Sequence, residues 1–145
     1  MKALSIHPYY AMAIVAGQKT VECRSWSTDY RGDILICSTA KKYHGTIPGH
    51  ALGVVSLEDV VPFEKRHLKD ALMEPKDFHY NNFAWILSYN RLVVPVPVKG
   101  RLSLWNYDGE LQYIPESEWL LPPGANPEDS PAGDWVKRYW EPLMT

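Results

Sequence analysis

The segment that decides the fold is Gly17-Gln18-Lys19-Thr20-Val21-Glu22-Cys23-Arg24, which follows a short apolar stretch. Apolar and polar side chains alternate in its second half, and this alternation predicts a half-buried strand. Side chains two residues apart on a strand point to the same side, so Glu22 and Arg24 share a face with Thr20. Lys19 lies at the turn before the strand and can fold over that face. Together these groups would hydrogen-bond a polar planar ligand such as the edge of a base.

The rest of the chain predicts a mainly β protein with a few helices. Short strands recur at fairly regular spacing with two or three helices between them, which is typical of a small closed β-barrel with helices at its rim. The first helix should begin at Pro8 and end at Gly17. The expected strands are residues 3–6, 19–26, 34–37, 51–57, 83–87 and 92–98, and the expected helices are residues 9–16, 64–73 and 134–141.

Two of these strands carry further information. The continuous apolar run from Ile34 to Cys37 predicts a strand that is covered on both faces. In the strand at residues 92–98, Pro95 and Pro97 remove backbone donors from one side only. This pattern favours a strand whose proline-blunted side lies at an edge of the sheet.

Length and composition describe one ordinary domain over residues 1–145. Hydrophobic residues make up 46% of the chain and charged residues 22%, which excludes a disordered tail protein. No apolar run approaches the roughly 18 residues of a membrane span, and the first residues lack the apolar region of a secretory signal. We therefore expect no membrane association and a cytoplasmic location. Cys23 and Cys37 are expected to be reduced thiols, although a disulfide between them is also compatible with the sequence.

The formal net charge of −2 hides an uneven distribution. Residues 1–50 hold six lysines and arginines against three acids, whereas residues 111–145 hold two against six. The first third therefore predicts either a local basic surface that can meet phosphate or a solvated surface of mixed charge. The acidic C-terminal segment offers a surface for a protein partner, which would make the chain an interaction domain of a regulator.

The charged cluster at residues 19–24 has two interpretations on spacing alone. In the first, Glu22 and Arg24 form an ion pair on an exposed strand, as is common on protein surfaces, and Lys19 extends into water. In the second, the side chains line a dry hollow, where desolvation lowers the pKa of Lys19 and allows its amine to act as a base.

The segment from Gly17 to Arg24 resembles the G-x-K-x-x-E-x-R signature of the ASCH domain, a family of the PUA-like superfamily. Further segments resemble later parts of the family in the same order. The resemblance covers about residues 3–107 and leaves 108–145 as a C-terminal extension packed on the barrel. It implies a PUA-like small β-barrel with a ligand cleft beside the first helix and the signature strand. The matching later segments are residues 25–26, 30–32, 36–41, 51–55, 83–87, 97–100 and 104–105.

The resemblance also implies a function. The superfamily is associated with RNA and with modified nucleobases, which implies recognition of a nucleobase, a nucleotide or RNA. Some small ASCH proteins are amidohydrolases that remove an acyl group from the exocyclic nitrogen of cytosine in nucleosides, and others are linked to RNA cleavage. In the amidohydrolases the signature lysine is catalytic, with a signature threonine and a downstream glutamate. Lys19 matches that lysine, Glu22 stands where the threonine would be, and Glu58 and Glu74 are candidates for the downstream acid.

The predicted site follows from the cluster and the resemblance together. Lys19 and Glu22 are the candidate catalytic residues, with Lys19 as general base and Glu22 orienting the base or carrying the proton. Arg24 would donate to a carbonyl, a phosphate or an oxyanion, and Trp26 and Trp85 would stack on a base. The resemblance adds the end of the second core strand, with Ser38, Thr39 and Lys41 as substrate contacts.

Other residues of interest have simpler expected roles. No metal or cofactor is expected, because the histidines lack the spacing of metal ligands and the cysteines lack a CxxC pair. Trp105 is expected to be structural. Trp119, Trp135 and Trp140 are expected to anchor the extension on the barrel, and either Tyr9 or Tyr10 is expected to face the cleft.

Overall fold

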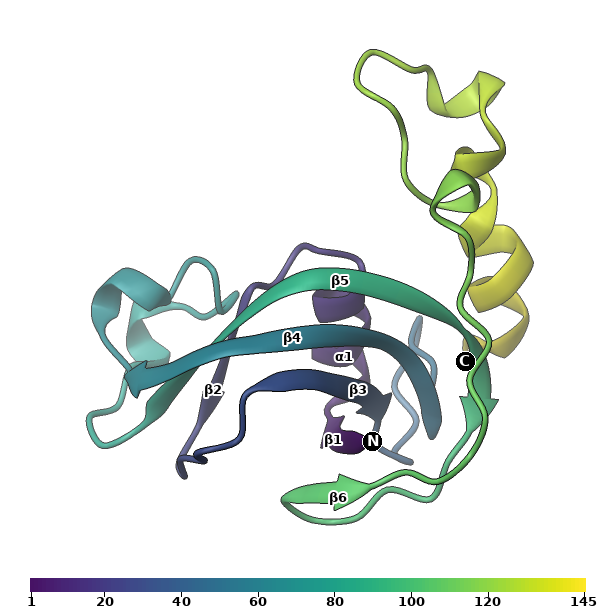
Figure 1. Ribbon diagram of the computed structural model, residues 1–145. Coiled ribbons are helices and arrows are strands. Elements are labelled where there is room, and N and C mark those ends of the chain that lie inside the picture. The colour runs from purple at the N-terminus through teal and green to yellow at the C-terminus, as the bar shows by residue number, and fades with distance from the viewer.

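The computed structural model describes residues 1–145, apart from the side chains of Pro127 and Pro131. Six strands form one sheet in the order β2-β5-β4-β3-β1-β6, in which β1 and β3 are parallel and the other neighbours antiparallel. The long strands β4 and β5 arch over helix α1 (Figure 1). The bounds are β1 (Lys2–Ile6), α1 (Pro8–Val15), β2 (Val21–Arg24), β3 (Gly32–Ser38), β4 (His50–Pro62), β5 (Phe83–Pro97) and β6 (Leu104–Asn106).

The sheet is a curled half-barrel. The prediction of a mainly β, PUA-like architecture is confirmed, but the prediction that strand pairing closes the barrel is wrong. Strands β2 and β6 are the two edges of the sheet. The four-residue strand β2 pairs with β5 alone, and α1 covers the open side by packing on β1, β3, β4 and β5. The Arg24 guanidinium donates to the Ser5 carbonyl across 3.1 Å, so a side chain spans from β2 to β1 where backbone pairing is missing.

Strand β3 is covered on both faces, as its apolar run predicted. Ile34 and Ile36 lie in the main core beneath α1, whereas Leu35 and Cys37 lie in a second core on the opposite face. Both cysteines are free thiols. Burial raises the pKa of Cys37 to about 12, so this thiol stays protonated at neutral pH.

Residues 83–97 form one strand where two were predicted. Its first half lies between β2 and β4, and its second half has β4 on one side and only the bridge from Val93 to Tyr113 on the other. The Val98 amide donates towards β4, to the carbonyl of Gly49. Because backbone amides alternate sides along a strand, the nitrogen of Pro97 faces the open side. The prediction of a proline-blunted edge is thus confirmed for Pro97 alone, because a register shift precedes it and the Val94 amide donates to Gln112 on the other side of β5.

The prediction of a helix over residues 64–73 is wrong. A 3₁₀ turn η1 (Lys65–His67) and further turns lead to a second 3₁₀ turn, η2 (Pro75–Asp77). Leu68 and Ala71 pack into a small core with Val21, but Leu72 is 37% exposed, with a positive φ of 56°. A residue in the left-handed conformation interrupts helical geometry. The apolar residues whose spacing suggested a helix therefore pack within a compact loop.

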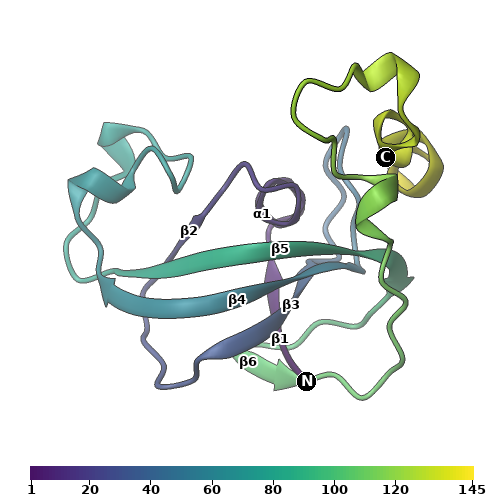
Figure 2. The same cartoon turned by 45° about the horizontal axis from the view of Figure 1, so that its top comes forward.

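The C-terminal extension ends in short helical turns. Where an α-helix was predicted over residues 134–141, the structure has the π-helical turn η6, in which backbone hydrogen bonds join residues five apart. Its tryptophans Trp119, Trp135 and Trp140 pack on the main core, which confirms their anchoring role. The extension and the loop between β4 and β5 lie at opposite ends of these strands (Figure 2). The turns are η3 (Glu116–Glu118), η4 (Pro127–Asp129), η5 (Pro131–Gly133), η6 (Val136–Trp140) and η7 (Glu141–Leu143).

The predicted single domain over residues 1–145 and the cytoplasmic location stay predictions. None of the helices in the described part of the chain has both the length and the apolar composition needed to span a bilayer.

The anchoring of the extension predicts a large effect at Trp140, which is 4% exposed. Trp140→Ala should lower the free energy of unfolding by about 3–5 kcal/mol, because a buried indole leaves a large cavity. Trp140→Phe should lower the free energy of unfolding by a smaller amount. It keeps an aromatic ring and removes the indole nitrogen, which is buried without a hydrogen bond among the described residues. Urea unfolding measures both effects.

Leu120→Ala is the matched control, because Leu120 lies in the same extension and is 52% exposed. It should change the free energy of unfolding by less than about 0.5 kcal/mol. Equal stability of the Trp140→Ala variant and the unmodified chain would contradict the anchoring role.

Candidate functional site

A cleft of about 550 Å³ opens beside the start of α1 and strand β2. Five segments contribute to it: the end of β1, α1, the turn into β2 with β2 itself, the residue after β3, and the loop around η2. These segments are far apart in sequence and meet because the sheet curls around α1. The lining residues are Ser5, Ile6, His7, Tyr10, Lys19, Glu22, Cys23, Arg24, Thr39, Met73 and Asp77.

Three charged side chains form the wall of the cleft on the β2 side. The Glu22 carboxylate lies between two cations, with Oε1 3.5 Å from Nζ of Lys19 and Oε2 3.2 Å from Nε of Arg24. Lys19 is 3% exposed and Glu22 is 7% exposed. The structure therefore excludes the exposed ion pair and confirms that these groups gather in a hollow.

Lys19 reaches the cleft because of the way α1 ends. Gly17 adopts a φ of 86°, and the amides of Gln18 and Lys19 both donate to the carbonyl of Ala13. This turn directs the lysine side chain back towards the helix, where its amine donates to the carbonyl of Ala71 and lies 4.8 Å from the centre of the Tyr10 ring. Glycine suits this position because the left-handed conformation costs it little.

Thr20 does not join the cluster. Its side chain is exposed, and its backbone amide donates to the carbonyl of Asp70. The expected strand from residue 19 begins only at Val21, so the alternation that placed Thr20 beside Glu22 does not extend to it.

Burial and charge act on the Lys19 amine in opposite directions. Desolvation by burial lowers the pKa of Lys19 below its ordinary value, and the charge and hydrogen-bonding capacity of Glu22 partly oppose that effect. Burial also raises the pKa of the neighbouring Cys23 thiol, and the Glu22 charge adds to that effect. The site thus favours a neutral thiol and an amine that gives up its proton more easily than a lysine in water.

Arg24 retains unused hydrogen-bonding capacity. One of its terminal nitrogens donates to Ser5, but its Nε lies near Glu22 without hydrogen-bond geometry. Within the part of the chain that the structure describes, this Nε is buried and has no hydrogen-bond partner. A buried donor left in this state carries a desolvation cost that an incoming acceptor would remove.

The end of β3 contributes one of its three predicted contacts. Thr39 lines the cleft. Ser38 is buried and exchanges hydrogen bonds with the backbone of His50, so it fastens β3 to β4 and faces no ligand. Lys41 is exposed and lies 5.4 Å from the centre of the Tyr43 ring, outside the lining of the cleft.

The two predicted stacking tryptophans are not brought to the cleft. Trp85 has no exposed surface and packs edge-on against Trp26 with ring centres 4.8 Å apart. Its indole nitrogen donates to the Trp26 carbonyl across 3.2 Å. Both rings support the strand that carries Glu22, and neither offers a face to a ligand in the cleft.

Sequence reasoning missed several lining residues. Of the two tyrosines at the start of α1, Tyr10 faces the cleft and Tyr9 is 56% exposed. His7 precedes the helix and caps it by accepting a hydrogen bond from the Tyr9 amide. Met73 ends the segment that was predicted as a helix, and Asp77 follows it in η2; no local pattern indicates that this loop returns to β2. Asp77 lines the cleft, whereas the two candidate acids Glu58 and Glu74 do not.

Comparison with known proteins places this arrangement in a family. The family model described as ASCH domain matches residues 4–108. The chain belongs to the ASCH family. Activating signal cointegrator 1 from Homo sapiens and from Mus musculus are similar to it, at 28% and 26% identity over 132 residues that cover 74% of this chain. The chain spans 22% of the length of these relatives.

Solved ASCH structures have the same fold. The crystal structure of ASCH from Zymomonas mobilis aligns with a TM-score of 0.61 at 20% identity, covering 74% of this chain and 87% of that chain. A tyrosine-to-phenylalanine variant of that protein aligns with a TM-score of 0.58 at 21% identity, covering 74% and 89%. The family match ends at residue 108, so most of the extension lies outside it.

The buried cluster predicts a coupled titration. The pKa of Lys19, followed through its Cε chemical shift as a function of pH, should lie below that of an ordinary lysine. It should fall further in Glu22→Gln, because the carboxylate that favours the charged amine is removed. The unfolded chain binds this proton more tightly, so the free energy of unfolding should rise as the pH passes from the folded pKa of Lys19 to its ordinary value.

Glu110→Gln serves as the control, because Glu110 is exposed and follows β6. This variant should leave the titration of Lys19 unchanged. A Lys19 amine that titrates like a lysine in water would show that the cluster is solvated.

Proposed function

We propose that the cleft recognises a nucleobase or nucleotide within RNA. The observation that carries this proposal is the Glu22 carboxylate held between Lys19 and Arg24 in the wall of an open cleft. Removing charged groups from water costs several kcal/mol, and apolar side chains of similar volume often stabilise a fold equally well. A buried ionic cluster at a cleft is therefore better explained by ligand recognition than by stability.

The charges of the cleft suit a neutral, polar and planar ligand. Lys19 and Arg24 are balanced by Glu22 and Asp77, so the cleft has no large excess of either sign. Glu22 would accept a hydrogen bond from an exocyclic amine, and Arg24 would donate to a ring nitrogen or carbonyl. The rings of Tyr10 and His7 supply aromatic surface at the same opening, in the role first predicted for the tryptophans.

Exposed lysines near the cleft support RNA rather than a free base. Thr39 lines the cleft, and Lys41 and Lys42 follow it with exposed side chains. Flexible ammonium groups at the rim of a base-binding site suit the phosphates on either side of the bound nucleotide.

Hydrolysis is the second candidate function, supported by the lowered pKa of Lys19 and by Asp77 as a second acid in the cleft. The substrate would be an N4-acylated cytosine nucleoside. Lys19 would take a proton from a water molecule whose oxygen attacks the acyl carbon, and Arg24 would stabilise the oxyanion. The C–N bond then breaks, and the protonated lysine returns its proton to the exocyclic nitrogen, directly or relayed through the Asp77 carboxylate. The free nucleoside and a carboxylic acid leave, and the acid releases its proton to water to become the carboxylate. RNA cleavage, which needs the same base and acid, is a variant of this candidate.

Recognition predicts saturable binding that depends on Glu22. Labelled single-stranded RNA and free nucleosides, modified and unmodified, are titrated at two salt concentrations. Glu22→Gln should weaken binding by about tenfold or more, because a hydrogen bond to a charged group is lost, whereas Glu110→Gln should bind normally. Lys41→Gln should lower the salt dependence of RNA binding by about 0.7 in slope and leave nucleoside binding unchanged. Absence of saturable binding to every ligand would end the proposal.

Hydrolysis predicts turnover of N4-acetylcytidine to cytidine and acetate, which chromatography separates. Lys19→Ala should lower kcat/KM about 100-fold or more, and Asp77→Asn should lower it as well, because each removes a proton-transfer group. Lys137→Ala, at an exposed lysine of the extension, should not change it. Turnover that survives Lys19→Ala would contradict the assigned role of this residue.

A further inference from the structure

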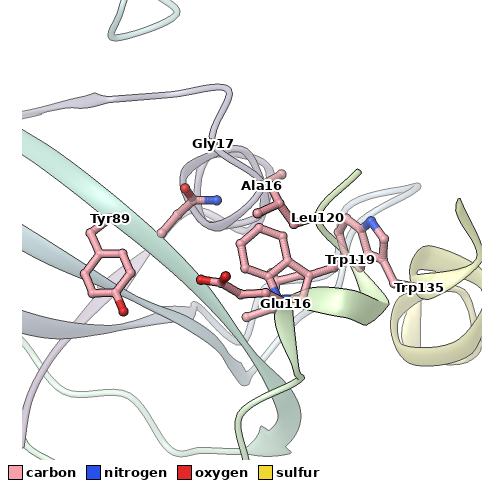
Figure 3. Close-up of a pocket in the computed structure, with 9 residues that line it drawn as sticks. Ala16, Gly17, Tyr89, Glu116, Trp119, Leu120 and Trp135 are labelled. Carbon is pink, nitrogen blue, oxygen red and sulfur yellow. The ribbon is translucent and has the colours of Figure 1, made fainter. Parts of the chain in front are cut away.

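A second cavity of about 410 Å³ lies between the C-terminal end of α1, the middle of β5 and the extension. Gly17 contributes to this cavity, whereas Lys19, two residues further on, contributes to the cleft described above. Figure 3 shows Tyr89 on one side, Trp119 and Trp135 on the other, and the carboxylate of Glu116 between Tyr89 and Trp119. Glu116, Trp119 and Trp135 all lie beyond the residues that match the ASCH family model.

The aromatic walls of this cavity are held in place and remain accessible. Tyr89 is 62% exposed, and one face of its ring is covered by the Arg91 guanidinium at 4.0 Å. The indole nitrogen of Trp119 donates to the carbonyl of Ile114 across 3.1 Å, and Trp135 packs edge-on against the buried Trp140. These contacts fix the rings without covering the surface that faces the cavity.

The backbone at Tyr89 is strained. Its φ is 50°, a left-handed value that is rare for a bulky aromatic residue, and it lies where the pairing of β4 and β5 shifts register. The shift turns the ring out of the sheet towards the extension, at the cost of a less favourable backbone. Strain of this kind persists where the surrounding structure enforces it, and it is concentrated at binding sites.

The charges around the cavity are negative. Glu116 is exposed and has no ion-pair partner among the described side chains. The C-terminal end of α1 borders the same space, but its last carbonyls already accept hydrogen bonds, that of Val15 from the Asn90 side chain, so the negative charge comes from Glu116. The nearby guanidinium of Arg91 is already bound to the Asp33 carboxylate through two hydrogen bonds of 3.0 and 2.7 Å. The cavity therefore disfavours a phosphate and favours a cation.

The geometry points to a site for a positively charged side chain, lysine or arginine, from a basic segment of a protein partner. A cation enclosed by aromatic rings is attracted by their faces, and a carboxylate at the edge of the ring cluster adds a direct charge interaction. Residues 111–145, which complete the cavity, hold six acids against two bases, so the extension as a whole is complementary in charge to a basic segment. The site is separate from the base-binding cleft and does not depend on the function proposed for that cleft.

The test uses three acetylated, amidated pentapeptides of sequence Gly-Ser-X-Ser-Gly, in which X is arginine, lysine or citrulline. They are titrated into the full chain, and the indole N–H signals of the six tryptophans are followed by NMR. The signals of Trp119 and Trp135 should shift saturably with the arginine or the lysine peptide, while those of Trp85 and Trp105 stay in place. Citrulline, a neutral isostere of arginine, should cause no saturable shift.

Matched variants separate the contribution of the Glu116 charge to peptide binding from that of the Tyr89 ring. Glu116→Gln should weaken binding of the better cationic peptide about fivefold, and Tyr89→Leu should have a similar effect. Tyr89→Phe should bind normally because it keeps the ring face, and so should Glu128→Gln, whose exposed carboxylate lies elsewhere in the extension. The spectra themselves show whether each variant is folded.

Four results would overturn the proposal. The first is equal binding of the citrulline peptide. The second is unchanged affinity in both Glu116→Gln and Tyr89→Leu. The third is the absence of any saturable shift at Trp119 and Trp135. A shift of these two signals with single-stranded RNA in place of the peptides would assign the cavity to nucleic acid and would also overturn it.

Discussion

The position of one carboxylate determines most of the candidate site. Glu22 lies between Lys19 and Arg24, and each of these cations makes a second contact with another part of the fold. Lys19 donates to the loop that follows β4, and Arg24 donates to β1. The ion cluster therefore links four segments across the side of the sheet where backbone pairing is missing. Loss of the carboxylate would leave the buried Lys19 and the half-buried Arg24 without compensation, which carries an electrostatic cost.

The short connection from α1 to β2 places the polar cleft and the aromatic cavity close together. Gly17 borders the aromatic cavity, and Lys19 borders the polar cleft. The polar cleft is built by residues within the family match, whereas the aromatic cavity is completed by the extension. The two hollows also differ in charge, because one holds balanced cations and anions and the other holds an unpaired carboxylate beside aromatic rings. They are therefore suited to chemically different ligands.

The candidate site was predictable where its residues are close in sequence. Glu22 and Arg24 lie two apart on a strand, and Lys19 lies at its start, so local geometry brings them together. The stacking role of Trp85 was a reasonable inference from its strand, but burial depends on the neighbouring strands and on α1, which no local pattern reports. Met73 was missed because an apolar spacing compatible with a helix belongs to a loop of short turns that contains Leu72 in a left-handed conformation. Asp77 lies beyond that segment, in η2, and was missed because no local pattern places this turn against the cleft.

The sequence by itself determined where most of the strands lie, the first helix and the grouping of the charged residues, because alternation, helix-end signals and residue spacing act over a few neighbours. The tertiary structure alone decided that the sheet remains open, that α1 and the Arg24 side chain cover the gap, and that Tyr89 faces the extension. It also decided which polar groups lose contact with water. That outcome depends on packing between segments that are far apart in the chain, such as Trp105 and Ser5, which are 100 residues apart and joined by a hydrogen bond, and such contacts are set by the whole fold.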